Sequence, residues 1–116
     1  MRVVEHGFSE GVELARAGRY FDAHEAFEAA WRAAAPDERD FFQGLVHVVV
    51  AWYQDGRGNL VGCTRQLEKA RRRLSPFAPA HRGLDVDAVV AQLGAAAPPG
   101  LAPLELPEAD GVEQVT

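Results

Sequence analysis

The sequence predicts an all-α fold, a compact bundle of about five helices. Apolar residues recur every three or four positions in five segments, which Gly, Pro or Asn residues separate. The one long valine-rich run has no partner strand of comparable strength, so a buried helix explains it better than a sheet. The chain has 116 residues, of which 47% are hydrophobic and 25% charged, a balance typical of one folded core.

The first two helices are predicted in the N-terminal third of the chain. Residues 8–17 place Phe8 and Val12 on a broad apolar face, and Gly18 follows where a helix C-terminus favours glycine. The second helix is predicted for residues 20–35, where a high alanine content favours helix and Pro36 ends it.

A third helix is predicted for residues 37–55, and it begins with acidic residues that suit a helix N-terminus. It then becomes apolar on nearly every side, through Phe41, Phe42, Leu45, Val46, Val48, Val49, Val50, Trp52 and Tyr53. A surface helix would keep a broad polar face, so we expect this helix at the centre of the bundle.

The fourth and fifth helices follow turn signals. Asn59 is a favourable N-cap for a helix over residues 60–74, and Asp85 can cap a short helix through residues 86–93. Residues 75–83 between them contain two prolines and are predicted to form a loop.

The composition changes after residue 96. The sequence thus predicts a helical domain over residues 1–96 and an extended Pro-rich C-terminal tail over residues 97–116. Leu101, Leu104 and Leu106 suggest a strap lying on the bundle or on a partner, before a frayed end.

Charge and composition disfavour several classes of function. A net charge of −5 and a pI near 5.3 oppose non-specific binding of nucleic acid. Cys63 is the one cysteine, so no disulfide can form within the chain, and we expect it to be inert core. The N-terminus lacks an apolar secretory segment, and the longest apolar run is shorter than the about 20 residues that cross a bilayer. We therefore expect a cytoplasmic protein without a membrane partner.

Polar residues on the second and third helices form the main candidate site. Spacings of three and four place His24, Glu28 and Trp31 in one narrow sector of the second helix. On the third helix Gln43 and His47 share a line, and Gly44 beside them lets a neighbouring helix approach closely. A short connection makes the two helices antiparallel neighbours. The sequence predicts a pocket between them, lined by His24, Glu28, Gln43 and His47, with Trp31 as its wall.

Several motifs occur in a fixed order between residues 8 and 93. They are Gly18-Arg19-Tyr20-Phe21, His24-Glu25-x-x-Glu28-x-x-Trp31, Phe42-Gln43-Gly44-Leu45, Gly58-Asn59-x-x-Gly62, and Ala70 with Leu74. In this combination the chain resembles the bacterial and archaeal domain-of-unknown-function family 309. The resemblance implies a small all-helical protein with no established biochemical role. Some members carry the label "predicted metal-dependent hydrolase". Tyr53 stands where the family often has a histidine, which weakens a metal site that needs that residue.

Three interpretations of the polar cluster are open. His24 and Glu28 could bind a divalent metal, as in a metal-dependent hydrolase, although a zincin would need a second histidine in place of Glu28. The cluster could instead be a structural hydrogen-bond network, or it could bind a small ligand. We favour a non-catalytic or small-ligand-binding domain. Whether the protein is an enzyme, which residues would be catalytic and which cofactor it would use stay open.

Two further features suggest binding rather than chemistry. The stripe Arg65, Lys69, Arg71, Arg72 and Arg73 could bind phosphate, RNA or an acidic partner, but a solvated helix face is favoured.

The spacing of Gly18, Tyr20, Ala23, Phe27 and Ala30 is similar to a tetratricopeptide unit, so an adaptor module is a second alternative. Which protein partner the chain would have stays open, and the tail leucines would suit a homodimer without requiring one. His6 and His81 are predicted to be ordinary surface histidines.

Overall fold

A computed structural model describes residues 2–110, and this part of the chain forms a bundle of five helices. They are α1 (Arg2–Arg16), α2 (Tyr20–Ala33), α3 (Arg39–Gly56), α4 (Leu60–Leu74) and α5 (Val86–Ala95). The predicted all-α class is therefore confirmed, and the valine-rich run is helical.

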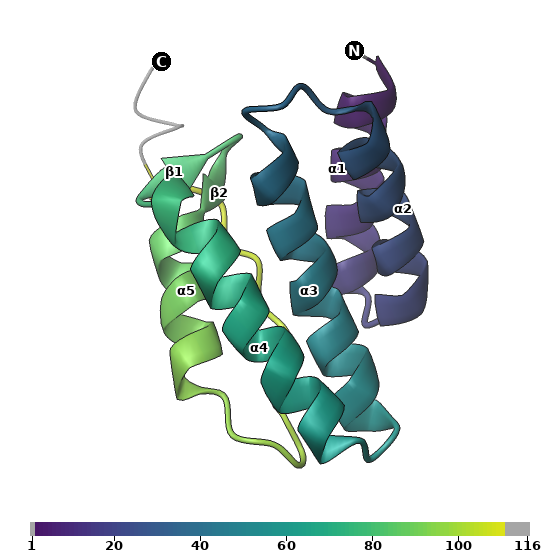
Figure 1. The fold of residues 1–116 in the computed structure, drawn as a ribbon, viewed down its shortest axis with the longest axis vertical. Helices are drawn as coiled ribbons and strands as arrows, with labels where there is room; N and C mark the ends of the chain where they lie inside the picture. The colour runs from purple at the N-terminus through teal and green to yellow at the C-terminus, as the bar shows by residue number, and fades with distance from the viewer. Residues whose placement is uncertain (1, 111–116) are drawn as a thin grey trace.

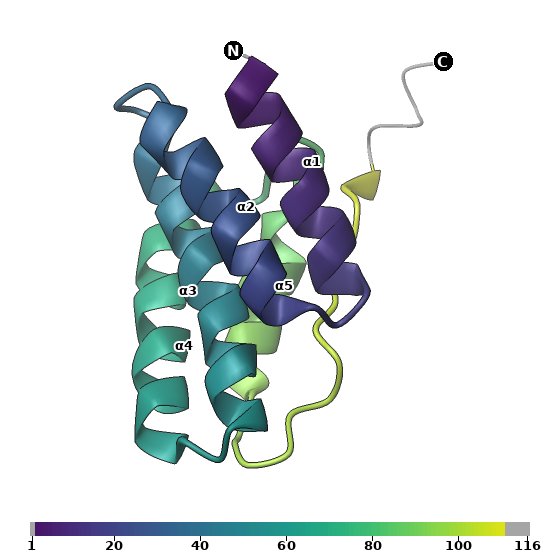
Figure 2. The same ribbon diagram turned by 90° about the vertical axis from the view of Figure 1, so that its right-hand side faces the viewer.

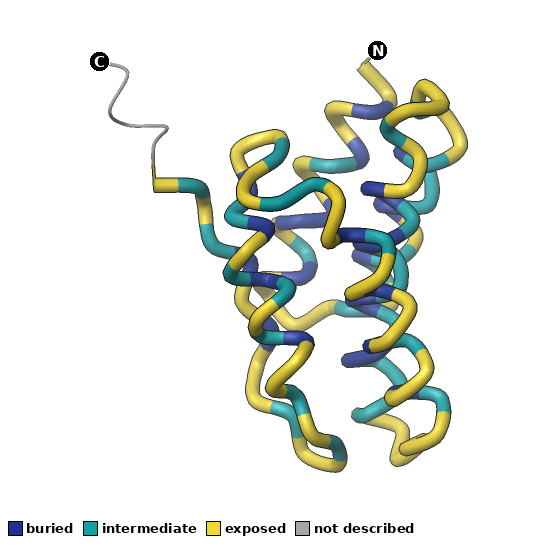
Figure 3. Tube along the Cα trace, turned by 60° about the vertical axis from the view of Figure 1, so that its left-hand side comes forward, coloured by how far each residue is buried: buried dark blue, intermediate teal, exposed yellow. Residues whose placement is uncertain are grey.

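Helix α3 is the central element. It lies between the α1–α2 pair and the α4–α5 pair, as two perpendicular views show (Figures 1 and 2). Its buried side chains are Phe41, Phe42, Leu45, Val48, Val49, Ala51 and Trp52. Buried positions gather in the middle of the bundle, where the helices lie side by side, and the connections at its ends are mostly exposed (Figure 3). A half-buried stripe on α3, including Gln43, His47 and Val50, is the part that the other helices leave partly open.

The predicted helix caps are confirmed. The Asn59 side chain accepts a hydrogen bond from the Gly62 backbone N–H at 2.9 Å, and α4 has the predicted bounds. Asp85 likewise accepts from the Ala88 N–H at 2.9 Å at the start of α5. Gly18 follows α1 with a φ of 79°, the left-handed conformation that favours glycine.

Helix α1 begins at Arg2, six residues before its predicted start. Gly7, one residue before the predicted start, lowers the helix propensity of the first turns, whereas Gly11 lies inside the predicted helix. In the folded chain both glycines face α2. A Cβ atom at Gly7 would lie 2.8 Å from the Ala26 carbonyl oxygen, and one at Gly11 would overlap the Phe27 ring. Close helix packing thus outweighs the propensity cost.

The segment predicted as a loop contains regular structure. A 3₁₀ turn spans Ser75–Phe77, and β1 (Ala80–His81) pairs antiparallel with β2 (Leu84–Asp85). Arg82 and Gly83 between the strands have φ values of 51° and 78°. Two successive residues with positive φ form the turn of a tight hairpin. This turn accounts for the two strands, which the prolines in the segment made unexpected.

The extended tail is confirmed and runs along the bundle as a strap, here residues 97–110. Leu104 and Leu106 are buried in the core. The Trp52 indole N–H donates to the Ala102 carbonyl at 2.7 Å, and the Gly100 and Leu101 N–H groups donate to the Asp55 carboxylate at 2.9 Å. The predicted frayed end, residues 111–116, lies outside the described residues. Within residues 2–110, no helix is long and apolar enough to cross a membrane.

Candidate functional site

His24 and Glu28 lie one turn apart on α2, at the margin of the core. His24 Nε2 is 3.8 Å from one Glu28 carboxylate oxygen, and the other oxygen accepts a hydrogen bond from Arg32 at 3.0 Å. The two side chains are 25% and 34% exposed. The predicted adjacency is present, and Glu28 is shared between a histidine and an arginine.

The second ring nitrogen of His24 is the unusual feature. Nδ1 is buried and has no hydrogen-bond partner within the described part of the chain. Buried polar atoms nearly always have a partner, so an orphaned one needs an explanation. His24 also lines a cavity of about 180 Å³, whose other walls are Phe21, Val50, Tyr53 and Gln54.

Trp31 and Glu28 are not among the residues that line this cavity. Trp31 is half-buried, and the Arg39 guanidinium lies 4.6 Å from the centre of its ring, at the start of α3. This is a cation–π contact, so Trp31 links the C-terminal end of α2 to the start of α3.

His47 contacts α4. Its Nδ1 lies 2.7 Å from Gln66 Oε1. Gly44, one turn away, allows the close approach that the sequence predicts, because a Cβ there would be 2.7 Å from Leu74 Cδ2. The predicted cluster is therefore divided between two helix contacts. His24, which lies on α2 with Glu28, lines the cavity, whereas His47 is bonded to Gln66 of α4, with half-buried Gln43 one turn before it on α3.

The environment of His47 favours the neutral ring. Burial lowers its pKa most, the hydrogen bond with Gln66 acts in the opposite direction, and the positive charges of Arg73, Lys69 and Arg72 lower it further. Because Gln66 Oε1 is an acceptor, Nδ1 carries the proton and Nε2 is left with a lone pair. Nε2 is buried and has no partner among residues 2–110.

A catalytic metal is not matched by these donors. A catalytic zinc site takes three protein ligands, and His24 with Glu28 supplies two. Across residues 2–110 no three His, Cys, Asp or Glu side chains are grouped as a metal would need. Tyr53 does not extend the set, because its ring packs on Phe21 at 5.5 Å and its hydroxyl accepts a hydrogen bond from Arg57.

Cys63 does not provide a nucleophile either. It is fully buried, and burial followed by the nearby Asp55 charge raises the pKa of its thiol. The thiol is therefore protonated at neutral pH, and the prediction that it belongs to the core is confirmed.

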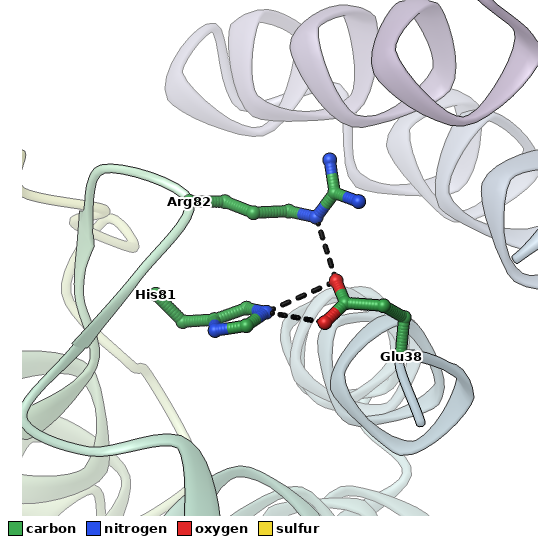
Figure 4. A network of polar contacts seen from close by, with 3 residues as sticks. All are labelled: Glu38, His81 and Arg82. Atoms are coloured by element: carbon green, nitrogen blue, oxygen red, sulfur yellow. Dashed lines mark hydrogen bonds and ion pairs between the residues drawn. The ribbon is translucent and has the colours of Figure 1, made fainter. Parts of the chain in front are cut away.

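The prediction that His81 is an ordinary surface histidine is wrong. Figure 4 shows the His81 ring and the Arg82 guanidinium meeting the Glu38 carboxylate, at 2.9 Å and 2.8 Å. The His81 ring also packs edge-on against Phe41, 4.6 Å between centroids. Burial would raise the pKa of Glu38, but the hydrogen bonds from Arg82 and His81 outweigh it and lower the pKa. Forty-three positions separate Glu38 from His81, and no local pattern signals their contact.

The network joins the β1–β2 hairpin to the start of α3. Arg82 also lies over the Phe42 ring, 5.1 Å from its centre, so Arg82 and His81 both rest on the aromatic core. Both oxygens of the Glu38 carboxylate accept hydrogen bonds from the hairpin, so the cluster holds the hairpin against the start of α3.

On α4 the basic stripe is mostly solvated. Arg73 donates to Asp40 of α3 at 2.7 Å, whereas Arg65, Lys69, Arg71 and Arg72 are exposed. This pairing holds the Arg73 end of the stripe against α3, which is also the helix that carries His47.

Comparison with known proteins gives one match. Residues 8–66, slightly more than half of the chain, match a family described as "Domain of unknown function (DUF309)". No curated protein matches the chain, and no solved structure matches it. The matched region includes α2, α3 and both predicted histidines of the site. The chain therefore belongs to the DUF309 family of helical domains of unknown function.

Proposed function

We propose that this chain is a non-catalytic domain that binds a small organic ligand in the cavity beside His24. The observation that carries the proposal is the buried, unpartnered Nδ1 of His24, on a ring that forms one wall of that cavity. A ligand that hydrogen-bonds to Nδ1 would remove the cost of leaving this atom unpaired.

The cavity walls indicate the size and chemistry of the ligand. A volume of about 180 Å³ suits a single ring, since a cavity of about 150 Å³ holds benzene. Phe21, Val50 and Tyr53 offer apolar contact, and His24 and Gln54 offer polar contact. Phe21 is 49% exposed, so a ligand in the cavity would cover part of its ring. These features favour a one-ring ligand carrying one hydrogen-bonding group.

Saturation-transfer NMR with phenol as the probe tests this proposal. We expect transfer to phenol in the wild-type protein and its loss in His24→Ala. His6→Ala is the matched control, because His6 forms the same i,i+4 pair with Glu10, at 3.6 Å, but is 79% exposed. Equal transfer in all three proteins, at equal folded fractions by circular dichroism, would refute the proposal. His24→Gln provides a second variant if the alanine variant unfolds.

The alternatives keep their own supporting observations. The 3.8 Å separation of His24 Nε2 and Glu28 supports a metal-dependent hydrolase, whose further ligands would have to come from outside these two residues. The antiparallel hairpins α1–α2 and α3–α4 support a tetratricopeptide-like adaptor (Figure 1). An adaptor would bind an extended peptide without needing His24, so the phenol experiment separates it from the favoured function.

A further inference from the structure

The fold unites two parts of the sequence that have no local connection, namely the polar residues of α3 and the basic stripe of α4. We propose that Gln43, His47, Gln66, Lys69 and Arg73 form an oxyanion site that binds the phosphate group of a small ligand. This site lies on the α3–α4 contact, so it is separate from the cavity beside His24 and does not depend on the function proposed above.

Two interhelical contacts define the limits of the site. His47 meets Gln66 at 2.7 Å, and Asp40 meets Arg73 at 2.7 Å. Because α3 and α4 are antiparallel, the residues between these contacts lie opposite one another. Lys69 is three residues from Gln66 and four from Arg73, hence on the same face of α4. Gln43 has the corresponding position on α3.

The hydrogen-bond inventory leaves donors available for an anion. The side-chain oxygen of Gln66 accepts the hydrogen bond from His47, so the amide NH₂ of Gln66 is available to donate to an anion. Arg73 uses one terminal nitrogen on Asp40 and keeps two other nitrogens that can donate. Lys69 has no carboxylate within ion-pair distance in the described residues. Several donors converging on one group are what phosphate recognition requires.

The charge distribution favours an anion at this place in an otherwise acidic protein. Helix α4 carries five basic residues and one acidic residue, while the whole chain has a net charge of −5. The positive charges of Arg73, Lys69 and Arg72 already act on His47, since each lowers its pKa. A bound anion would offset these charges and so raise the pKa of His47.

His47 therefore serves as an internal reporter of binding. The experiment titrates the wild-type protein with inorganic phosphate, at ionic strength held constant with sodium chloride, and follows the His47 ring by NMR. We expect a saturable shift of its ring signals and a rise in its pKa. Lys69→Gln should weaken phosphate binding about threefold or more, as loss of one partly solvated charge contact does.

Arg65→Gln is the matched control. It removes the same charge from the same helix, but Arg65 is not among the residues that shift the pKa of His47. Equal weakening by Arg65→Gln and Lys69→Gln would overturn the site, because the effect would then be general electrostatic attraction. Absence of a saturable His47 shift would also overturn it. A ribo-oligonucleotide that shifts His47 where phosphate does not would replace the small-ligand site with a nucleic-acid surface.

Discussion

Gly44 tests the close contact on which the α3–α4 site depends. It faces α4, and a Cβ there would lie 2.7 Å from both Cδ2 and Cγ of Leu74. Leu74 is fully buried, so it has little room to move away. Gly44→Ala should therefore push α4 outwards or force Leu74 from its rotamer.

The expected loss of stability is a difference between two effects. Inserting a methyl group into a packed contact costs about 1–3 kcal/mol. Replacing glycine by alanine inside a helix returns about 1 kcal/mol. The net destabilisation is thus about 1 kcal/mol, which for a chain of this size lowers Tm by roughly 4 °C. The same displacement should lengthen the hydrogen bond between His47 and Gln66.

Gly56→Ala gives the matched comparison. Gly56 belongs to the same helix, and a Cβ there would meet no atom within 4 Å. Urea unfolding followed by circular dichroism should show Gly44→Ala less stable than wild type and Gly56→Ala at least as stable. If Gly44→Ala proves as stable as Gly56→Ala, the packing argument for the α3–α4 contact is refuted.

Three further variants test the Glu38 network, the contact of the strap with Asp55 and the N-cap of α4. Glu38 has a lowered pKa in the folded state, so its stabilising effect is present above its unfolded pKa and is lost as pH falls through the folded pKa. Glu38→Gln should therefore destabilise the protein at pH 7 and cost less at pH 3, by urea unfolding at both pH values; an equal loss at both would contradict the network. Asp55→Ala removes the acceptor of two strap N–H groups, and hydrogen exchange at Gly100 and Leu101 should accelerate; unchanged rates would mean that the strap is held by other contacts. Asn59→Ala removes the cap of α4 and should cost about 1 kcal/mol of unfolding free energy, whereas no loss would discount the cap.

Much of the fold could be predicted because its signals are local. The caps at Asn59 and Asp85 and the apolar spacing of three or four positions depend on residues within one turn of each other. The start of α1 could not be predicted in the same way. Gly7 lowers the helix propensity there, and the reason for a glycine at this position, close contact with Ala26 of α2, exists only in the folded chain.

The candidate site shows the same division. Helical spacing correctly placed His24 beside Glu28, because both lie on α2. Spacing also placed Gln43 and His47 on one face of α3, but it could not tell which neighbouring helix that face meets. The contact of His47 with Gln66 shows that this face meets α4. The contact between Glu38 and His81 depends on how the chain folds back and has no local sequence signal.

In the proposed function, His24 binds an organic ligand rather than a metal. The most direct test is the metal content of the protein purified without a metal-binding tag, measured by inductively coupled plasma mass spectrometry for wild type, His24→Ala and His6→Ala. We expect far less than one zinc, iron or manganese per chain in all three, also after incubation with each ion and desalting. Near one metal per chain in wild type and His6→Ala, lost in His24→Ala, would contradict the account and make the hydrolase the leading function.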